Sequence, residues 1–67
     1  MITDRQKANW AVAHARQTSR KRLTPALRAA YNDEPFGVPD GAAMQDALLY
    51  AQEIVAALEA GLELRSL

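Results

Sequence analysis

The stretch that decides the fold is residues 41–60, which read GAAMQDALLYAQEIVAALEA. It is rich in strong helix formers and contains no proline, so it predicts one long helix. Apolar residues recur in it at alternating spacings of four and three, the pattern of a heptad seam. That row contains Met44, Leu48, Ala51, Val55, Leu58 and, just beyond the stretch, Leu62. A second apolar row lies beside the first and contains Ala47, Tyr50, Ile54 and Ala57. A helix this apolar is expected to be covered on more than one side.

Residues 3–22 are predicted to form the other long helix. Thr3 and Gln6 have the spacing of a capping box, in which the threonine oxygen accepts from the glutamine backbone amide and the glutamine side chain reaches back. Small residues recur on one face of this helix, and they are Ala8, Ala11 or Val12, Ala15 and Ser19. A partner helix can therefore approach that face closely.

Thr24-Pro25 predicts a break after this helix. Proline lacks a backbone amide and disfavours helical geometry in the residue before it, but it suits the first position of a new helix. We therefore expect a short helix over residues 25–31. Its apolar contacts should be Leu23, Leu27 and either Ala30 or Tyr31.

The segment 32–41 contains two prolines and two glycines and is predicted to be an ordered connector. Phe36 and Val38 are expected to attach it to the core. Asp40 suits the N-cap of the following helix. At the other end of that helix, Gly61 suits a left-handed C-terminal cap; alternatively, the tail 62–67 prolongs the helix.

Together these elements predict an all-α fold, a single domain over residues 1–67. The two main helices should pack as an antiparallel hairpin, with the short helix and the connector closing one end. Burial of six side chains should supply most of the stability, namely Met44, Leu48, Ala51, Ile54, Val55 and Leu58.

Because a hairpin has only one inner face, the remaining apolar row should pair with its copy in a four-helix homodimer. The expected dimer contacts are Leu48, Val55, Leu58 and Leu62.

Composition also favours self-association. A chain of 67 residues can bury only a small core, and it has no cysteine for a disulfide. A structural zinc site is equally unexpected, because His14 is the only histidine. The N-terminus lacks the apolar core of a signal peptide, and no stretch is apolar enough to span a bilayer. We therefore expect a cytoplasmic protein without membrane contact.

Charge is sorted along the chain although its sum is zero. Residues 1–32 carry seven basic groups against Asp4, a net charge of +6, and residues 33–67 carry seven acids against Arg65, a net charge of −6. One basic cluster would suit the phosphates of nucleic acid, and it contains Arg16, Arg20, Lys21, Arg22 and Arg28. Alternatively, these cations favour the C-terminal end of their own helix and face the acids of the third helix.

Catalytic equipment is missing from the sequence. His14 has only Thr18 and Ser19 as nearby hydroxyls, and there is no glycine-rich phosphate loop. The acids Asp33, Glu34 and Asp40 do not have the spacing of a calcium loop. No enzyme activity, cofactor or metal is therefore expected.

The sequence thus predicts a non-enzymatic helical protein that binds a protein partner and modulates or inhibits it. The expected partner-binding residues are Trp10, His14, Arg20, Tyr31 and Phe36. The alternative is a nucleic-acid-binding accessory protein that uses the basic cluster. In size, alanine-rich helices and lack of cysteine, the chain is similar to short accessory proteins of phages and mobile elements, which often block a host protein.

Overall fold

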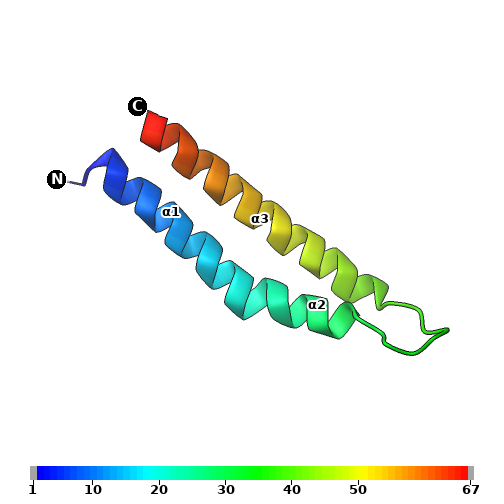
Figure 1. Ribbon diagram of the computed structural model, residues 1–67. Coiled ribbons are helices and arrows are strands. Elements are labelled where there is room, and N and C mark those ends of the chain that lie inside the picture. The colour runs from blue at the N-terminus through cyan, green and yellow to red at the C-terminus, as the bar shows by residue number, and fades with distance from the viewer. Residues whose placement is uncertain (1, 67) are drawn as a thin grey trace.

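The protein is an all-α antiparallel hairpin, as the computed structural model shows for residues 2–66 (Figure 1). One arm contains α1 (Asp4–Thr18), a π-helical turn η1 (Ser19–Leu23) and α2 (Thr24–Ala30). The other arm is α3 (Gly41–Ser66), and the two arms lie side by side in an elongated body of 54 × 16 × 16 Å. The predicted hairpin is therefore confirmed.

The N-terminal cap of α1 forms as predicted. The Gln6 backbone amide donates to Thr3 Oγ1 over 3.2 Å, and the Thr3 amide donates to Gln6 Oε1 over 3.0 Å. Both bonds involve groups that an uncapped helix leaves without an intrahelical partner. This cap could be identified from the sequence because it depends on only four consecutive residues.

The predicted break at Pro25 is wrong, because the first arm continues through it as helix. At η1 the Thr24 amide donates to the Ser19 carbonyl, one residue further back than in an α-helix. Pro25 then occupies the first turn of α2, where its missing amide is tolerated. The short helix is thus a continuation of the first arm, and it does not close the end of the hairpin as predicted.

The extra residue in η1 changes which side chains face α3. Before the turn, Ala8, Ala11, Ala15 and Thr18 lie towards α3, at spacings of three and four. Ser19, in the turn itself, is half-buried, and after it the inward residues are Leu23, Ala26 and Ala30, with Leu23 five positions after the buried Thr18. An uninterrupted α-helix would bring Arg22 to the interface instead. Arg22 lies at the side, with its guanidinium 5.8 Å from the centre of the Tyr50 ring. Of the predicted apolar contacts, Leu23 is half-buried and Ala30 is buried, whereas Leu27 and Tyr31, the alternative to Ala30, are exposed.

The connector between Ala30 and Gly41 projects from the end of the hairpin (Figure 1). The prediction that Phe36 and Val38 attach it to the core is wrong, because their side chains are 98% and 81% exposed. Asp40 caps α3 as predicted, with its Oδ1 accepting from the amides of Ala42 and Ala43.

The third helix runs through Gly61 to Ser66, so of its two predicted ends the alternative is the correct one. Gly61 is not a left-handed cap, since no glycine among the described residues has a positive φ. It is buried where the two arms cross most closely, and a Cβ on it would lie 3.3 Å from the Ala11 Cβ and 3.5 Å from the Ala8 carbonyl oxygen. Its role is close approach between helices rather than helix termination.

On α3, the residues that face the first arm are those of the second apolar row identified in the sequence, with Gly61 added at its C-terminal end. This seam contains Ala47, Tyr50, Ile54, Ala57 and Gly61. The predicted core is therefore wrong in four positions, because Met44, Leu48, Val55 and Leu58 are exposed. The alanine face of α1 packs against the row that contains Ala47, Ala57 and Gly61, whose small size lets the backbones approach.

One copy of the hairpin has a very small core. Its buried apolar residues are Ala15, Ala30 and Ala47, and no large side chain among the described residues is fully buried. A core of alanines supplies little hydrophobic stabilisation, because each methyl group removes little apolar surface from water.

Candidate protein-interaction surfaces

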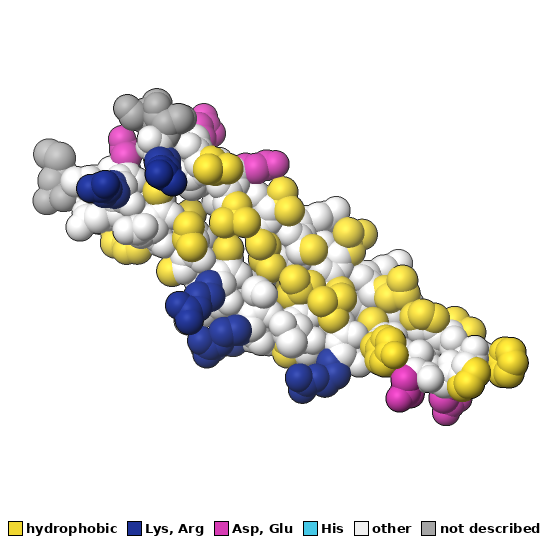
Figure 2. Space-filling model, viewed as in Figure 1, with side chains coloured by type: hydrophobic (Ala, Val, Ile, Leu, Met, Phe, Trp, Pro, Cys, Tyr) yellow, Lys and Arg dark blue, Asp and Glu magenta, His cyan; other side chains and the backbone are white. Residues whose placement is uncertain are grey.

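The largest apolar surface is a row of exposed side chains on α3, which we call the apolar stripe. It contains Met44, Leu48, Ala51, Val55, Leu58 and Leu62. Its large side chains are between 41% exposed, at Leu58, and 66% exposed, at Leu62. Figure 2 shows hydrophobic side chains gathered in a band along the hairpin on this side. Isolated exposed leucines are ordinary, but a continuous apolar row on a small protein indicates a surface that another molecule covers.

The stripe follows directly from helix periodicity. Every member after Met44 lies one residue after a member of the inward seam, for example Leu48 after Ala47 and Leu58 after Ala57. One residue is about 100° of helix rotation, so the stripe lies at the side of the hairpin, next to the contact with α1. The four predicted dimer contacts, Leu48, Val55, Leu58 and Leu62, all belong to it.

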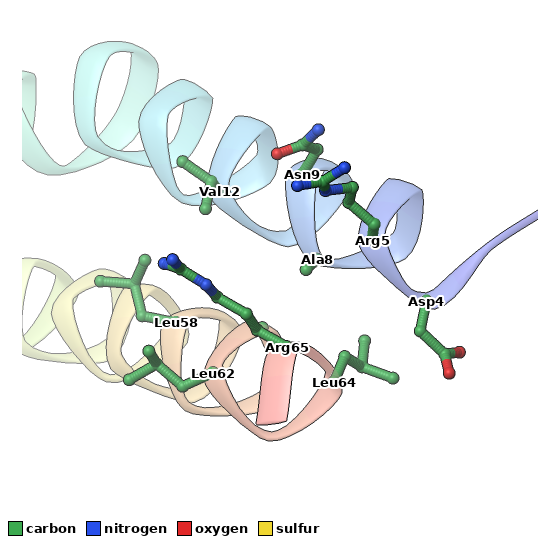
Figure 3. A pocket seen from close by; sticks show the side chains of 10 residues that line it. Asp4, Arg5, Ala8, Asn9, Val12, Leu58, Leu62, Leu64 and Arg65 are labelled. Atoms are coloured by element: carbon green, nitrogen blue, oxygen red, sulfur yellow. The ribbon is translucent and has the colours of Figure 1, made fainter. Parts of the chain in front are cut away.

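Near the free ends of the arms, the stripe borders a groove of about 710 Å³ between α1 and α3. Ala8 and Gly61 lie at its base, while Val12, Leu58 and Leu62 supply larger apolar side chains. In Figure 3, Leu58 points from α3 towards α1, and Asp4 lies at the open end of the groove, at the start of α1. Arg5, Asn9 and Arg65 also line the groove, and in Figure 3 the Arg65 side chain extends from α3 towards α1.

The sequence placed Val12 only as an alternative to Ala11 on the face towards the other arm, and not on the surface that contains the stripe. Val12 lies one residue after Ala11, as Leu58 lies one residue after Ala57. In an antiparallel pair, positions that follow the seam by one residue lie on the same side of both helices. Val12 therefore extends the stripe onto α1, and the same offset rule would have identified it once the inward rows were known.

The five predicted partner-binding residues lie in two places. Trp10, His14 and Arg20 line one shallow depression on the outer side of α1, together with Arg16 and Gln17. Tyr31 and Phe36 lie at the other end of the molecule, in and beside the connector, and both are exposed. The structure brings three of the five together and separates the other two.

The basic cluster lies along the outside of the first arm. Figure 2 shows Lys and Arg side chains along the α1 and α2 edge of the hydrophobic band. All five members are exposed, and Arg16, Arg20, Lys21 and Arg28 form no ion pair within the part of the chain that the structure describes. The expectation that these cations face acids of α3 is therefore wrong for these four, because the seam holds the arms together through small apolar residues.

Comparisons with known proteins add no family or relative. No protein-family model matches the chain, and the searches of curated proteins and of solved structures gave no match.

Two further searches covered the described residues. No helix within them is long and apolar enough to cross a membrane. They also contain no cluster of three or more His, Cys, Asp or Glu side chains arranged to hold a metal ion.

Proposed function

We propose that this chain is a non-enzymatic interaction protein that binds a protein partner and modulates or inhibits it. The observation that carries the proposal is the apolar stripe, in which Leu48, Val55, Leu58 and Leu62 are exposed in one copy. Protein side chains are the natural cover for such a row, because an amphipathic helix pairs with another through interlocking apolar side chains.

The proposal gives the two main surfaces different roles. The stripe is a surface that other protein side chains cover, and the depression around Trp10, His14 and Arg20 is the surface that binds the modulated partner. Tryptophan and arginine are enriched among residues that dominate binding energy, since both combine a large contact area with hydrogen-bond donors. Tyr31 and Phe36 form a separate candidate contact at the connector. We place this function in the cytoplasm, with which the absence of cysteine is compatible.

Protection of the stripe inside cells tests the proposal without knowledge of the partner. The chain has no cysteine, so a Val55→Cys variant carries one thiol, in a side chain of similar size. We expect a membrane-permeant maleimide to label this thiol about tenfold more slowly than the thiol of Gln52→Cys, which lies outside the stripe. Labelling is measured by mass spectrometry after brief exposure of living cells.

The purified chain provides the reference for this measurement. Diluted until any self-association is lost, it should label at similar rates at both positions, because residues 52 and 55 are both exposed in one copy. Equal labelling rates in cells would contradict the proposal, since they would mean that nothing covers the stripe.

The basic cluster supports a second candidate, binding of nucleic acid. It is favoured by the exposed cations at positions 16, 20, 21 and 28, which have no acidic partner among the described residues. Exposed cations at intervals along one helical arm can contact successive phosphates and release counterions.

Salt dependence separates this candidate from protein binding. If the cluster binds nucleic acid, the affinity should fall about tenfold or more between 50 and 200 mM salt. An Arg20→Glu, Arg28→Glu variant should then lose retention of a fluorescent oligonucleotide, measured by polarisation, whereas an Asp33→Lys, Glu34→Lys control should retain it. Binding that is unchanged in the Arg20, Arg28 variant would eliminate nucleic acid as the ligand of this cluster.

A further inference from the structure

We infer that a second copy of this chain covers the apolar stripe, and that the two connectors lie at the same end of the resulting four-helix assembly. This inference rests on the proposed function, but it is narrower. The proposed function requires only that protein covers the stripe, whereas the inference names the occupant and its orientation.

The composition of the core favours a second copy as the occupant. In one hairpin the buried apolar residues are three alanines, while the large side chains lie exposed on one side. Two hairpins placed stripe to stripe convert these exposed rows into a shared core, in which the stripe meets its own copy as a two-fold interface requires. The stripe extends over 19 residues of α3, about 27 Å of helix, so the shared core would run along about half of the 54 Å hairpin.

Two orientations bring the stripes together. If the two-fold axis is parallel to the helices, both connectors lie at one end and α1 of each copy lies over α3 of the other. If the axis is perpendicular to the helices, the connectors lie at opposite ends, with α1 over α1 and α3 over α3. Both orientations keep neighbouring helices antiparallel, so helix packing alone does not choose between them.

The distribution of charge between the two arms favours the same-end orientation. The arm from Asp4 to Ala30 carries seven basic residues and one acid, a net charge of +6. The arm formed by α3 carries four acids and one arginine, a net charge of −3. The same-end orientation therefore places opposite charges over each other, whereas the opposite-end orientation places like charges together. A single surface ion pair contributes little to stability. However, the interactions between the charged arms of the two copies are attractive in one orientation and repulsive in the other, and many charges contribute at once.

The relevant charges lie beside the stripe and are available for this role. Arg16 and Arg20 are exposed and make no ion pair within the described residues, and Glu59 is exposed on α3 directly after Leu58. In Figure 2, Lys and Arg side chains border the hydrophobic band on the α1 and α2 side, and acidic side chains border its α3 side near the C-terminal end. Such a border steers two copies into register without burying a charge.

Distance measurements between spin labels test the orientation. We would label three single-cysteine variants of the full chain, which has no other cysteine: Val38→Cys at the connector, Ile2→Cys at the free end, and Gln52→Cys near the middle. In the same-end orientation, all three labels should lie within about 30 Å of their copies, because packed helices are separated by about 10 Å and the labels add their own reach. In the opposite-end orientation, the labels at 38 and 2 should lie near the 54 Å length of the hairpin.

The label at position 52 is the matched control, because the middle of the hairpin stays near its copy in both orientations. Long distances at positions 38 and 2 with a short distance at 52 would overturn the same-end orientation. Absence of coupling at all three positions, at millimolar protein, would overturn the second copy as occupant. The proposed function would then be judged separately by Val55→Cys protection in cells, which a different protein partner would also produce.

Salt gives an independent readout of the same inference. In the same-end orientation unlike arms attract each other, and salt screens this attraction. The affinity of the dimer should therefore fall about threefold as salt rises from 50 to 500 mM, because the screening length falls below the separation of the arms. A dimer that becomes tighter over this range, measured by sedimentation equilibrium, would indicate like charges in contact and would contradict the same-end orientation.

Discussion

Replacement of Gly61 by leucine should destabilise the hairpin by about 3 kcal/mol, near the upper end of the usual range for overpacking. At this position even a Cβ would lie 3.3 Å from the Ala11 Cβ, so a leucine side chain must push the two arms apart. Separation there would weaken the whole seam of small side chains, because dispersion contacts are lost when packed surfaces move by a fraction of an ångström. Thermal and urea unfolding followed by circular dichroism measure the effect.

The matched control is Ala60→Leu, which adds a large side chain to the neighbouring, exposed position. Alanine and leucine have similar helix propensities, so this change should alter the free energy of unfolding by less than about 0.5 kcal/mol. If Gly61→Leu proved as stable as Ala60→Leu, the arms could not approach as closely at Gly61 as the structure has them.

Replacement of Leu48 and Val55 by glutamate should abolish self-association, with a loss of affinity of about 100-fold or more. Both side chains are more than half exposed in one copy, at 58% and 53%, so the substitution does not introduce charge into the hairpin's own seam. In a stripe-to-stripe dimer it would place four carboxylates in an apolar contact, where an unpaired charge is strongly unfavourable. Light scattering at several protein and salt concentrations measures the mass.

A Leu49→Glu, Ala56→Glu variant is the control for this prediction. It adds the same charges at the same spacing, one residue further along, on exposed positions outside the stripe. It should remain dimeric, and its melting temperature should still rise with protein concentration, as expected for any fold stabilised by association. A wild-type chain that is monomeric at all concentrations would refute the dimer and leave the stripe as the binding face for another molecule.

Local signals in the sequence predicted local structure well. The capping box at Thr3 and Gln6 and the N-cap at Asp40 are both present, because each needs only a side-chain oxygen within a few residues of a backbone amide. The antiparallel hairpin is also present, since two long helices with a short connector have few other ways to pack.

The errors occurred where a local signal had more than one structural solution. Pro25 can end a helix, but a π-helical turn before it gave the chain another way to accommodate the proline. Gly61 can end a helix, but it can also allow two helices to touch, and here it does the second. In both cases contact with the opposite arm decided between alternatives that are close in energy.

For the candidate surface, the sequence identified the side chains but not their surroundings. Leu48, Val55 and Leu58 were expected both to contribute to the hairpin core and to form a dimer contact, and Leu62 only to form a dimer contact. All four lie outside the seam of one copy. Val12 was missed as part of the same surface, because its side is defined only once the inward row of α1 is known.

The sequence by itself determined that this protein is helical, where its helices begin, and that α3 carries more apolar surface than one neighbour can cover. These properties follow from residue propensities, caps and periodicity within single segments. Only the tertiary structure decided which apolar row of α3 is covered and which remains exposed. The reason is close packing: the alanine face of α1 lies against Ala47, Ala57 and Gly61, and this choice leaves the larger residues of the stripe on the surface.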